Sequence, residues 1–259
     1  VIALFCLVKR KKFVFALASD KDVDGTFIKH STYCEQKSYI FGVKRADCII
    51  TQSEYQQGMV RERYNRESYL IRNAHPMDHS HPQADKLPIV LWVGTVKPEW
   101  KQPELFLKLA EKLPNIKFQM VGGASTNKEY FLDIKKRALG IPNLNFCGFV
   151  PYPSINTIFA SASVFVNTSS VEGFPNTFLQ AWANCTPVVS LNVDPDEIIC
   201  KHKLGFHSRT LDQMIKDVEI LMDDPQLRDE MGKNGRDYVE REHDLGKISQ
   251  KYIDLFNKL

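Results

Sequence analysis

The sequence predicts an α/β protein built from two Rossmann-like, doubly wound parallel-sheet domains that face a cleft. Three observations support this fold class. Short apolar stretches of strand length alternate with stretches of helical length, which is typical of parallel sheets covered by helices. The alternation occurs in two successive series. The polar, proline-containing stretch 73–87 between the series has the composition of a linker between domains.

The first series opens with the apolar residues 1–8, which we expect to end a buried helix or strand. Since the chain starts inside an apolar run, we expect its natural beginning to be absent and the first domain to be incomplete. The basic residues 9–12 then form a solvated turn. Strands are expected at 13–18, 47–51 and 68–72, and helices at 33–43 and 54–63.

The second series repeats this pattern over a longer stretch. Strands are expected at 89–93, 117–121, 145–150, 163–167 and 187–191, and helices at 103–112, 129–139, 155–160 and 178–184. The tail 211–259 is expected to be helical, with an apolar stripe formed by Ile248, Tyr252, Ile253 and Phe256. The expected domains are therefore 1–82 and 83–243, followed by a last helix at 244–259.

The composition is that of a soluble globular protein. Of the 259 residues, 43% are apolar and 25% are charged, so we expect no disordered domain. The net charge of +3 is too small to indicate nucleic-acid binding, and the basic run 135–137 has no aromatic residues among it. Residues 1–86 hold 14 basic and 10 acidic side chains, so the positive excess lies in this part. We expect a cytoplasmic protein, with contact of the basic run 9–12 with anionic lipid at the inner face of the membrane as an open alternative.

Several groups that resemble metal ligands are interpreted without a metal. The six cysteines are scattered without a C-x-x-C pair, and four lie in apolar runs, where cysteine packs as a small core residue. His75, His79 and His81 lack zinc-site spacing and are expected to be solvated. The Asp-x-Asp spacings at 22–24 and 194–196 are assigned to a first-domain loop and to a turn. We predict no metal cofactor.

Ligands of open parallel sheets bind beyond the carboxyl ends of the strands, so the residues after each strand are the candidates for function. Gly94 and Thr95 follow the strand at 89–93, and Lys101 stands before the next helix. A glycine there lets a ligand approach the backbone, and a lysine at a helix start can meet a phosphate as a point charge. Gly122 follows the next strand and permits the same close approach.

The segment 168–177, after the strand at 163–167, is the most informative. Pro175 presets the backbone of a helix start, and the N–H groups of residues 176–178 are expected to point outward and attract a diphosphate. Glu172 would repel a phosphate, so we expect it to accept hydrogen bonds from sugar hydroxyls. Gln180 is placed to bond ribose hydroxyls. Each residue has an ordinary alternative role in a turn or cap, but their joint placement at one sheet edge favours a binding site.

On these residues the chain resembles the retaining glycosyltransferases of family 4, which have the GT-B fold. The resemblance is strongest from 89 to 199 and rests on Gly94 with Lys101, Val121–Gly123, Phe146–Val150 and Ser170–Asn176. It implies transfer of a sugar from a nucleoside-diphosphate sugar to an acceptor hydroxyl with retention, in polysaccharide or glycoconjugate biosynthesis. It also implies that the family's first segment is missing before Val1 and that the last helix packs back on the first domain.

The resemblance also assigns roles to residues. Lys101 would bind the donor diphosphate and Glu172 the donor sugar, and these two are the catalytic candidates. The backbone near Phe149 and Val150 would receive the base. The other donor-binding candidates are Gly94, Thr95, Gly122, Gly173, Phe174, Pro175, Asn176, Thr177 and Gln180. No cofactor is implied besides the nucleotide sugar as co-substrate, and the acceptor would be a glycan, a lipid-linked molecule or a small molecule.

Three positions depart from the family pattern. Thr95 stands where the family usually has an arginine, and Gln180 replaces the second glutamate of a pair. Ser19 stands where a cleft histidine usually follows the strand, and it forms the acceptor-side candidates together with Asp20. Loss of one charge-assisted contact weakens donor binding by about 1.5–3 kcal/mol. Two alternatives stay open: a nucleotide-sugar epimerase of similar architecture, and a nucleotide-sugar-binding protein that has lost transfer.

Overall fold

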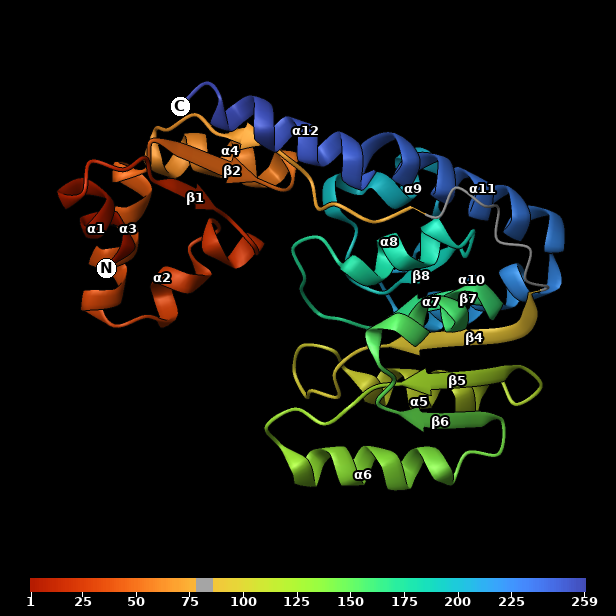
Figure 1. The fold of residues 1–259 in the computed structure, drawn as a ribbon. Helices are drawn as coiled ribbons and strands as arrows, with labels where there is room; N and C mark the ends of the chain where they lie inside the picture. Colours follow the sequence, from red (N-terminus) through yellow and green to blue (C-terminus); the bar gives the residue numbers. More distant parts are fainter. Residues whose placement is uncertain (78–85) are drawn as a thin grey trace. The chain divides into compact units, whose positions relative to one another are not determined.

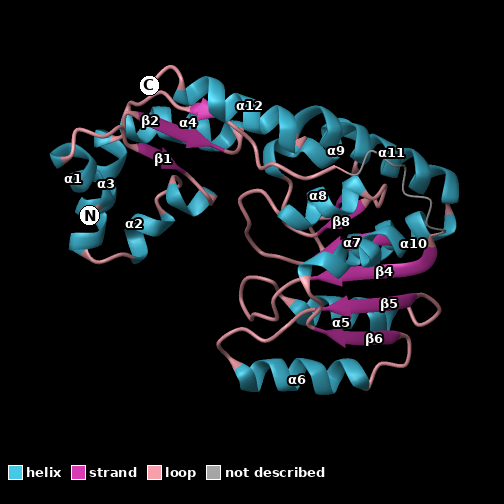
Figure 2. Ribbon diagram, in the orientation of Figure 1, coloured by secondary structure: helices cyan, strands magenta, loops and turns pink. Residues whose placement is uncertain are grey.

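The computed structural model describes residues 1–77 and 86–259, which form two compact units. Unit 1 comprises Val1–Pro76, Glu172–Phe174 and Glu242–Leu259, and unit 2 comprises Met77–Val171 and Pro175–Arg241. Each unit contains a parallel sheet with helices, which confirms the predicted α/β class (Figures 1 and 2). Among the residues assigned to the linker, His79 and His81 lie outside the described ranges.

Unit 1 is built on a three-stranded parallel sheet of order β1-β2-β3. Its strands are shorter than predicted: β1 (Val14–Ala16), β2 (Cys48–Thr51) and β3 (Tyr69–Leu70). Its helices are α1 (Ile2–Val8), η1 (Asp20–Asp22), α2 (Thr26–His30), α3 (Tyr33–Arg45), α4 (Glu54–Tyr64) and α12 (Leu245–Phe256). Ser53 caps α4, since its hydroxyl accepts a hydrogen bond from the Gln56 N–H at 3.2 Å.

The central strand β2 is buried on both faces of the unit 1 sheet. Because successive side chains of a strand point to opposite faces, β2 takes part in two separate apolar clusters. Ile49 packs with Leu17, Val43 and Val60. Cys48 and Ile50 pack with Ile71 and with Ile248 and Leu255 of α12. The last helix of the chain therefore covers one face of the sheet to which the first strands belong.

Unit 2 is built on a six-stranded parallel sheet of order β6-β5-β4-β7-β8-β9. The strands are β4 (Leu87–Val93), β5 (Lys117–Val121), β6 (Leu144–Gly148), β7 (Ala162–Asn167), β8 (Val188–Ser190) and β9 (Gly205–His207). In Figure 1 the arrowheads of β4, β5 and β6 point the same way. Side chains from both faces are fully buried, among them Phe106, Phe118, Phe165, Phe178 and Trp182.

The helices of unit 2 form two groups on its sheet. One group comprises α5 (Pro103–Lys112), α6 (Lys128–Leu139) and α10 (Leu211–Asp223), with α5 in contact with the other two. In the other, α7 (Tyr152–Ser161) contacts α8 (Asn176–Ala183). The remaining helices are η2 (Pro195–Glu197), α9 (Ile198–His202) and α11 (Pro225–Glu242). The bounds of α5 and β5 coincide with the prediction, whereas α2, α9 and β9 were not predicted.

Four expectations about burial are wrong in whole or in part. Residues 1–8 form the exposed helix α1, with Phe5 58% and Leu7 51% exposed. On α12 the buried apolar residues are Ile248 and Leu255, whereas Ile253 and Phe256 of the predicted stripe are more than half exposed. Of the cysteines, only Cys48 is buried. His75, expected in solvent, is buried: its N–H donates to the His243 carbonyl at 2.7 Å, and burial lowers the pKa of its ring.

Within the described residues, no helix has both the length and the apolar character needed to cross a membrane.

Candidate functional site

The direction of the connections in unit 2 changes between two neighbouring strands. From β4 the chain proceeds through β5 to β6 on one side, and from β7 through β8 to β9 on the other. The loops after β4 and β7 therefore leave the sheet at its topological switch point, where ligands of open parallel sheets bind. Lys101 lies in the loop after β4, and Pro175–Thr177 follow the loop after β7. The two principal candidate regions of unit 2 thus flank the same point.

The loops after β4 and β7 are joined by hydrogen bonds. The Thr168 hydroxyl donates to the Lys101 carbonyl at 2.7 Å. Ser170 donates from its backbone N–H to the Trp100 carbonyl at 2.8 Å. Its hydroxyl donates to the Glu99 carbonyl at 2.8 Å and lies 3.4 Å from the Trp100 carbonyl. The backbone that carries Lys101 is therefore held against the segment that follows β7.

The glycines after β4 and β5 are required by close backbone contact. A side-chain carbon on Gly122 would collide with the Gly94 carbonyl oxygen, so the two strand ends touch here. A side-chain carbon on Gly123 would lie 3.3 Å from Phe149 Cβ. The structure thus brings Gly94, Gly122 and Phe149 together at the carboxyl ends of three adjacent strands. Thr95 follows Gly94 directly.

Two aromatic side chains after β6 are largely exposed. Phe149 is 75% exposed and Tyr152, in the first turn of α7, is 66% exposed. Val150 between them is half-buried. Exposed aromatic rings beside a glycine-lined backbone offer flat apolar surface to a planar group. Tyr152 was not among the predicted site residues.

Helix α8 starts as the sequence predicted, with one difference. Pro175 is its N-cap with φ −67° and ψ 121°, and within the described residues no side chain caps this terminus. The positive end of the helix dipole lies here. The Phe178 N–H, expected to point outward, instead donates to the Pro175 carbonyl at 3.0 Å. That donor is already used inside the first turn, so the expected set of outward N–H groups is smaller by one.

A half-buried lysine contacts the other end of α8. Lys86 Nζ donates to the Asn184 carbonyl at 2.7 Å, just beyond the last turn of the helix. A cation at this end complements the helix dipole. Burial lowers the pKa of Lys86 to about 8. Gln180, in the middle of α8, is only 7% exposed, which limits the surface that it can offer to a ribose.

The segment Glu172–Phe174 belongs to unit 1, where it is tightly packed. A side-chain carbon on Gly173 would lie 2.9 Å from the Ala18 carbonyl oxygen and 3.2 Å from Ser19 Cα. A residue with a side chain would therefore force a shift of the backbone. Gly173 thus lies against the chain just after β1, beside the acceptor-side candidate Ser19.

Asn73 and His243 hold the Phe174 end of this segment. Asn73 Nδ2 donates to the Phe174 carbonyl at 3.2 Å, and the Phe174 and His243 ring centroids are 4.7 Å apart. His243 Nδ1 lies 2.7 Å from the Asn73 carbonyl oxygen, and because a carbonyl can only accept, this nitrogen carries the proton. Burial lowers the pKa of His243 to about 4, so the ring is neutral at neutral pH. Neither residue was predicted, although Asn73 follows the strand predicted at 68–72.

Ser19 and Asp20 are engaged in local structure. The Ser19 hydroxyl accepts from the Lys21 N–H at 3.3 Å and caps η1. Asp20 Oδ1 accepts from Gln56 Nε2 at 2.9 Å, and Gln56 is buried. Contact with a substrate would compete with these hydrogen bonds.

The aspartates considered as metal ligands also have structural partners. Asp22 Oδ2 accepts from the Ser19 N–H at 2.9 Å, and Asp194 Oδ1 accepts from the Ile199 N–H at 2.8 Å. The residues assigned to a turn at 194–196 form the start of the 3-10 helix η2, with Asp194 as its N-cap residue. Across residues 1–77 and 86–259, no group of three or more His, Cys, Asp or Glu side chains is arranged to hold a metal ion.

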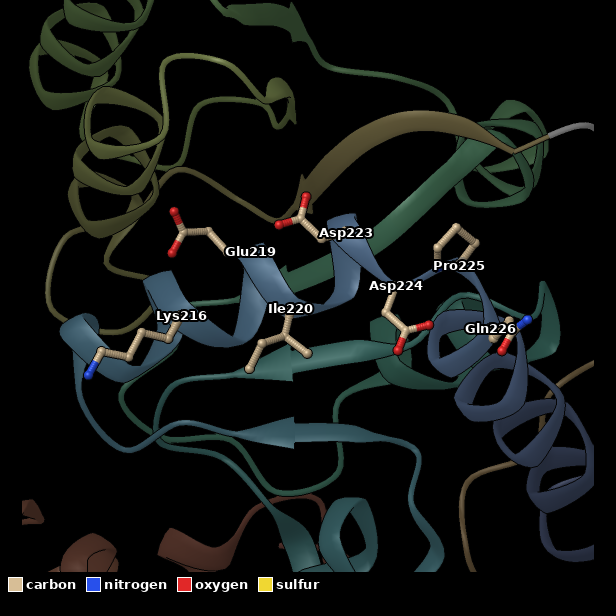
Figure 3. A pocket seen from close by; sticks show the side chains of 7 residues that line it. All are labelled: Lys216, Glu219, Ile220, Asp223, Asp224, Pro225 and Gln226. Atoms are coloured by element: carbon tan, nitrogen blue, oxygen red, sulfur yellow. The ribbon is translucent and has the colours of Figure 1, made fainter.

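A hollow of about 730 Å³ lies along α10 and the start of α11 (Figure 3). It is lined by Lys216, Glu219, Ile220, Asp223, Asp224, Pro225 and Gln226. Among the described residues that line it, none is a predicted site residue. The acidic side chains Glu219, Asp223 and Asp224 also make it a poor place for a diphosphate. The surface at the strand ends remains the candidate site.

Comparison with known proteins reveals a family model that matches most of unit 2. The family model described as "Glycosyl transferases group 1" matches residues 76–238. A trehalose synthase of Thermococcus litoralis is 26% identical over 182 residues, which are 66% of this chain and 44% of that protein. The chain therefore spans less than half the length of this curated relative.

Solved structures resemble the chain over nearly its whole length. HepE of Anabaena, solved in complex with UDP, matches with a TM-score of 0.82 and 16% identity over 99% of this chain and 75% of that chain. A TarM variant of S. aureus, solved with fondaparinux, alpha-GlcNAc-glycerol and UDP, matches with a TM-score of 0.79 and 18% identity over 96% and 51%. At these identities the likeness establishes the fold, which is the predicted GT-B fold.

Proposed function

Because the chain belongs to the glycosyl transferases group 1 family, we propose that the protein transfers a sugar from a nucleoside-diphosphate sugar to an acceptor hydroxyl, with retention of the anomeric configuration. The proposed pathway class is polysaccharide or glycoconjugate biosynthesis. One observation carries the proposal in this chain. The loops after β4 and β7 meet at the switch point of the unit 2 sheet and place Lys101 and the start of α8 beside it.

The proposed chemistry rests on stabilisation of the leaving diphosphate. As the glycosidic bond to the donor breaks, negative charge grows on the diphosphate. Lys101 and the N-terminal turn of α8 at Asn176 and Thr177 would take this charge, through a point charge and the helix dipole. Glu172 would hold the sugar through its hydroxyls, and the backbone from Gly173 to Pro175 would complete that contact.

The base and ribose would lie on the other side of the glycines. Gly94 and Gly122 would admit the nucleotide to the backbone beside Thr95, and Phe149 and Val150 would receive the base. Gln180 would offer its small exposed part to the ribose. Since Gln180 and Thr95 replace charged residues of the family pattern, we expect donor binding to be weaker than in relatives that keep them, by about 1.5–3 kcal/mol for each lost contact.

A second candidate function is nucleotide-sugar binding without transfer. It is favoured by Ser19 and Asp20, whose side chains are engaged in a cap and in a bond to Gln56. Transfer and binding differ in one measurement. Incubation with labelled donor and a panel of glycan, lipid-linked and small-molecule acceptors would yield a glycosylated product only under the first function.

The proposal is tested by calorimetry of the chain with UDP, GDP and ADP and with their sugars at up to millimolar concentration. UDP comes first because the HepE and TarM structures were solved with it. We expect saturable heat with one base and none with the others. Absence of heat with all of them would overturn the proposal. Conversion of a nucleotide sugar to its epimer without any acceptor would replace it by the epimerase alternative.

We place the reaction in the cytoplasm at the inner face of the membrane. The supporting observation is α1, whose exposed apolar residues Leu4, Phe5 and Leu7 adjoin the basic run 9–12. Such a pair of features suits an anionic lipid surface, with about 1 kcal/mol for each basic side chain near it. Co-sedimentation with vesicles containing phosphatidylserine, but not with pure phosphatidylcholine vesicles, is the expected result. Equal recovery with both would contradict this location.

A further inference from the structure

A buried chain of two hydrogen bonds connects β4 to the backbone of Lys101. Trp92 Nε1 donates to Thr168 Oγ1 at 3.0 Å, and the Thr168 hydroxyl donates to the Lys101 carbonyl at 2.7 Å. Trp92 is 2% exposed and Thr168 is fully buried. Trp92 lies near the carboxyl end of β4, and Thr168 directly follows β7. All three residues belong to unit 2.

The chemistry of the three groups determines which atom donates and which accepts in each of the two hydrogen bonds. The indole nitrogen can only donate, so it occupies a lone pair of the Thr168 oxygen. The single hydroxyl proton is then directed away from Trp92, and a carbonyl can only accept it. A buried hydroxyl that loses either partner carries a desolvation penalty, so this orientation is strongly favoured over others.

The backbone around Lys101 needs such support. Glu99 has φ 60° and Gln102 has φ 46°, both in the left-handed region that residues other than glycine rarely occupy. Conformations of this kind persist only where the surroundings enforce them. Here the carbonyls of Glu99, Trp100 and Lys101 all accept hydrogen bonds from the segment after β7. The Thr168 bond is the one that reaches Lys101 itself.

We propose that Thr168, oriented by Trp92, is a positioning residue that sets the backbone of Lys101 and thereby places its ammonium group at the donor diphosphate. The inference rests on the proposed function, since it assumes that Lys101 meets the diphosphate. Thr168 itself does not touch the ligand in this scheme. Its effect on binding must therefore vanish when the Lys101 side chain is absent.

A double-mutant cycle on the whole chain tests this requirement. Thr168→Val keeps the shape of the side chain and removes the hydroxyl, and Thr168→Ser restores it. Affinity is measured by calorimetry with whichever of UDP, GDP and ADP the unmodified chain binds best. We expect Lys101→Ala to weaken nucleotide binding about 10–100-fold and Thr168→Val to weaken it about 5–20-fold. The affinity of Thr168→Ser should stay within about 2-fold of that of the unmodified chain. Added to Lys101→Ala, Thr168→Val should change affinity less than about 2-fold.

Ser163 provides a matched control at the opposite end of the same two strands. Its buried hydroxyl donates to the Leu87 carbonyl at 2.7 Å, which is the same kind of bond between β7 and β4. Ser163→Ala should lower the melting temperature without changing nucleotide affinity. Should Thr168→Val not fold, Thr168→Ala removes the hydroxyl together with the methyl group and takes its place in the cycle.

The outcomes separate the two proposals. If the unmodified chain binds none of the three nucleotides, the proposed function falls and the inference with it. If Lys101→Ala weakens binding but Thr168→Val does not, the function stands and the inference is overturned. The inference is also overturned if Thr168→Val weakens binding equally in both backgrounds, because its effect would then not pass through Lys101.

Discussion

The segment after β7 is stabilised at its two ends by different units of the molecule. Thr168 and Ser170 are bonded to the loop after β4, in unit 2. Gly173 and Phe174 lie against the chain after β1 and accept a bond from Asn73, in unit 1. Under the proposed function, the first end orders the lysine for the diphosphate and the second orders the glutamate for the sugar. Recognition of phosphate and of sugar should therefore be separable by mutation.

The largest expected effect is at the phosphate end. With UDP and UDP-glucose as probe ligands, to be replaced by another nucleoside diphosphate and its sugar if that pair binds better, Lys101→Ala should weaken both affinities by the same factor. We expect about 10–100-fold, because the lost charge acts on the diphosphate that both ligands share. Calorimetry with both ligands measures this. Lys136→Ala, which removes a lysine of α6 that faces solvent, should change neither affinity. A larger loss for UDP-glucose than for UDP would contradict the separation.

The next effect is at the sugar end. Glu172→Ala should lower the ratio of the affinity for UDP-glucose to the affinity for UDP by about 10-fold, since a charged hydrogen-bond acceptor for the sugar is lost. The affinity for UDP itself should not change. The same pair of titrations provides the measurement. Glu219→Ala is the control, because Glu219 lines the hollow on α10 (Figure 3). Equal weakening of UDP and UDP-glucose by Glu172→Ala would place this glutamate at the phosphate instead.

A smaller effect of the same kind is expected for Asn73. Asn73→Ala removes the donor to the Phe174 carbonyl and should lower the ratio of the affinities for UDP-glucose and UDP about 5-fold. This factor corresponds to about 1 kcal/mol, the contribution of one neutral hydrogen bond. Asn145→Ala, at an exposed position of β6, should leave the ratio unchanged. If Asn73→Ala affects UDP as strongly as UDP-glucose, the two ends of the segment are not independent.

The last expected effect, about as large as that of Asn73→Ala, is a pH dependence confined to unit 1. The pKa of His243 is lowered to about 4 from its ordinary 6.5, because burial disfavours the charged ring. The unfolded chain therefore binds the proton first as the pH falls, so stability is full above pH 6.5 and declines toward pH 4. From pH 7 to 5.5 we expect a loss of about 1 kcal/mol.

Hydrogen exchange, corrected for intrinsic rates, measures this loss. Amides of β2 and α12 in unit 1 should lose protection, and those of β4 and β5 in unit 2 should not. His243→Asn keeps a donor near the Asn73 carbonyl and removes the titration of this ring. Unit 1 protection should then depend less on pH in this range, and the remaining dependence comes from His75, whose pKa burial also lowers. The same pH dependence in His243→Asn would assign it to another group.

The local pattern of the sequence was sufficient to predict most helices and strands and to place the candidate residues after particular strands. The bounds of α5 and β5 follow from an apolar stripe and a short apolar run, each ended by proline, glycine or polar residues. The placement of Lys101 and Pro175 beside the same strands followed from the rule that ligands meet strand ends. Both inferences need only information that is local in the sequence.

Burial and long-range hydrogen bonds could not be predicted in this way. Of the predicted α12 stripe, Ile248 and Tyr252 pack on the sheet, but Ile253 and Phe256 are exposed. The buried Leu255 was not predicted, because the partner surface decides which apolar residues are covered. The bond from Thr168 to Lys101 spans 67 positions and that from Asn73 to Phe174 spans 101. One local signal was present: a tryptophan inside a buried strand needs an acceptor for its N–H.

The hydrogen bonds that Ser170 donates to the loop after β4 have a consequence for engineering this protein. They tie the loop after β4 to the loop after β7 at Glu99 and Trp100, so an inserted or deleted residue in either loop shifts the register of both. Libraries that vary the length of one loop alone should yield mostly poorly folded variants. Libraries that exchange both loops as a matched pair should recover folded proteins and altered donor preference.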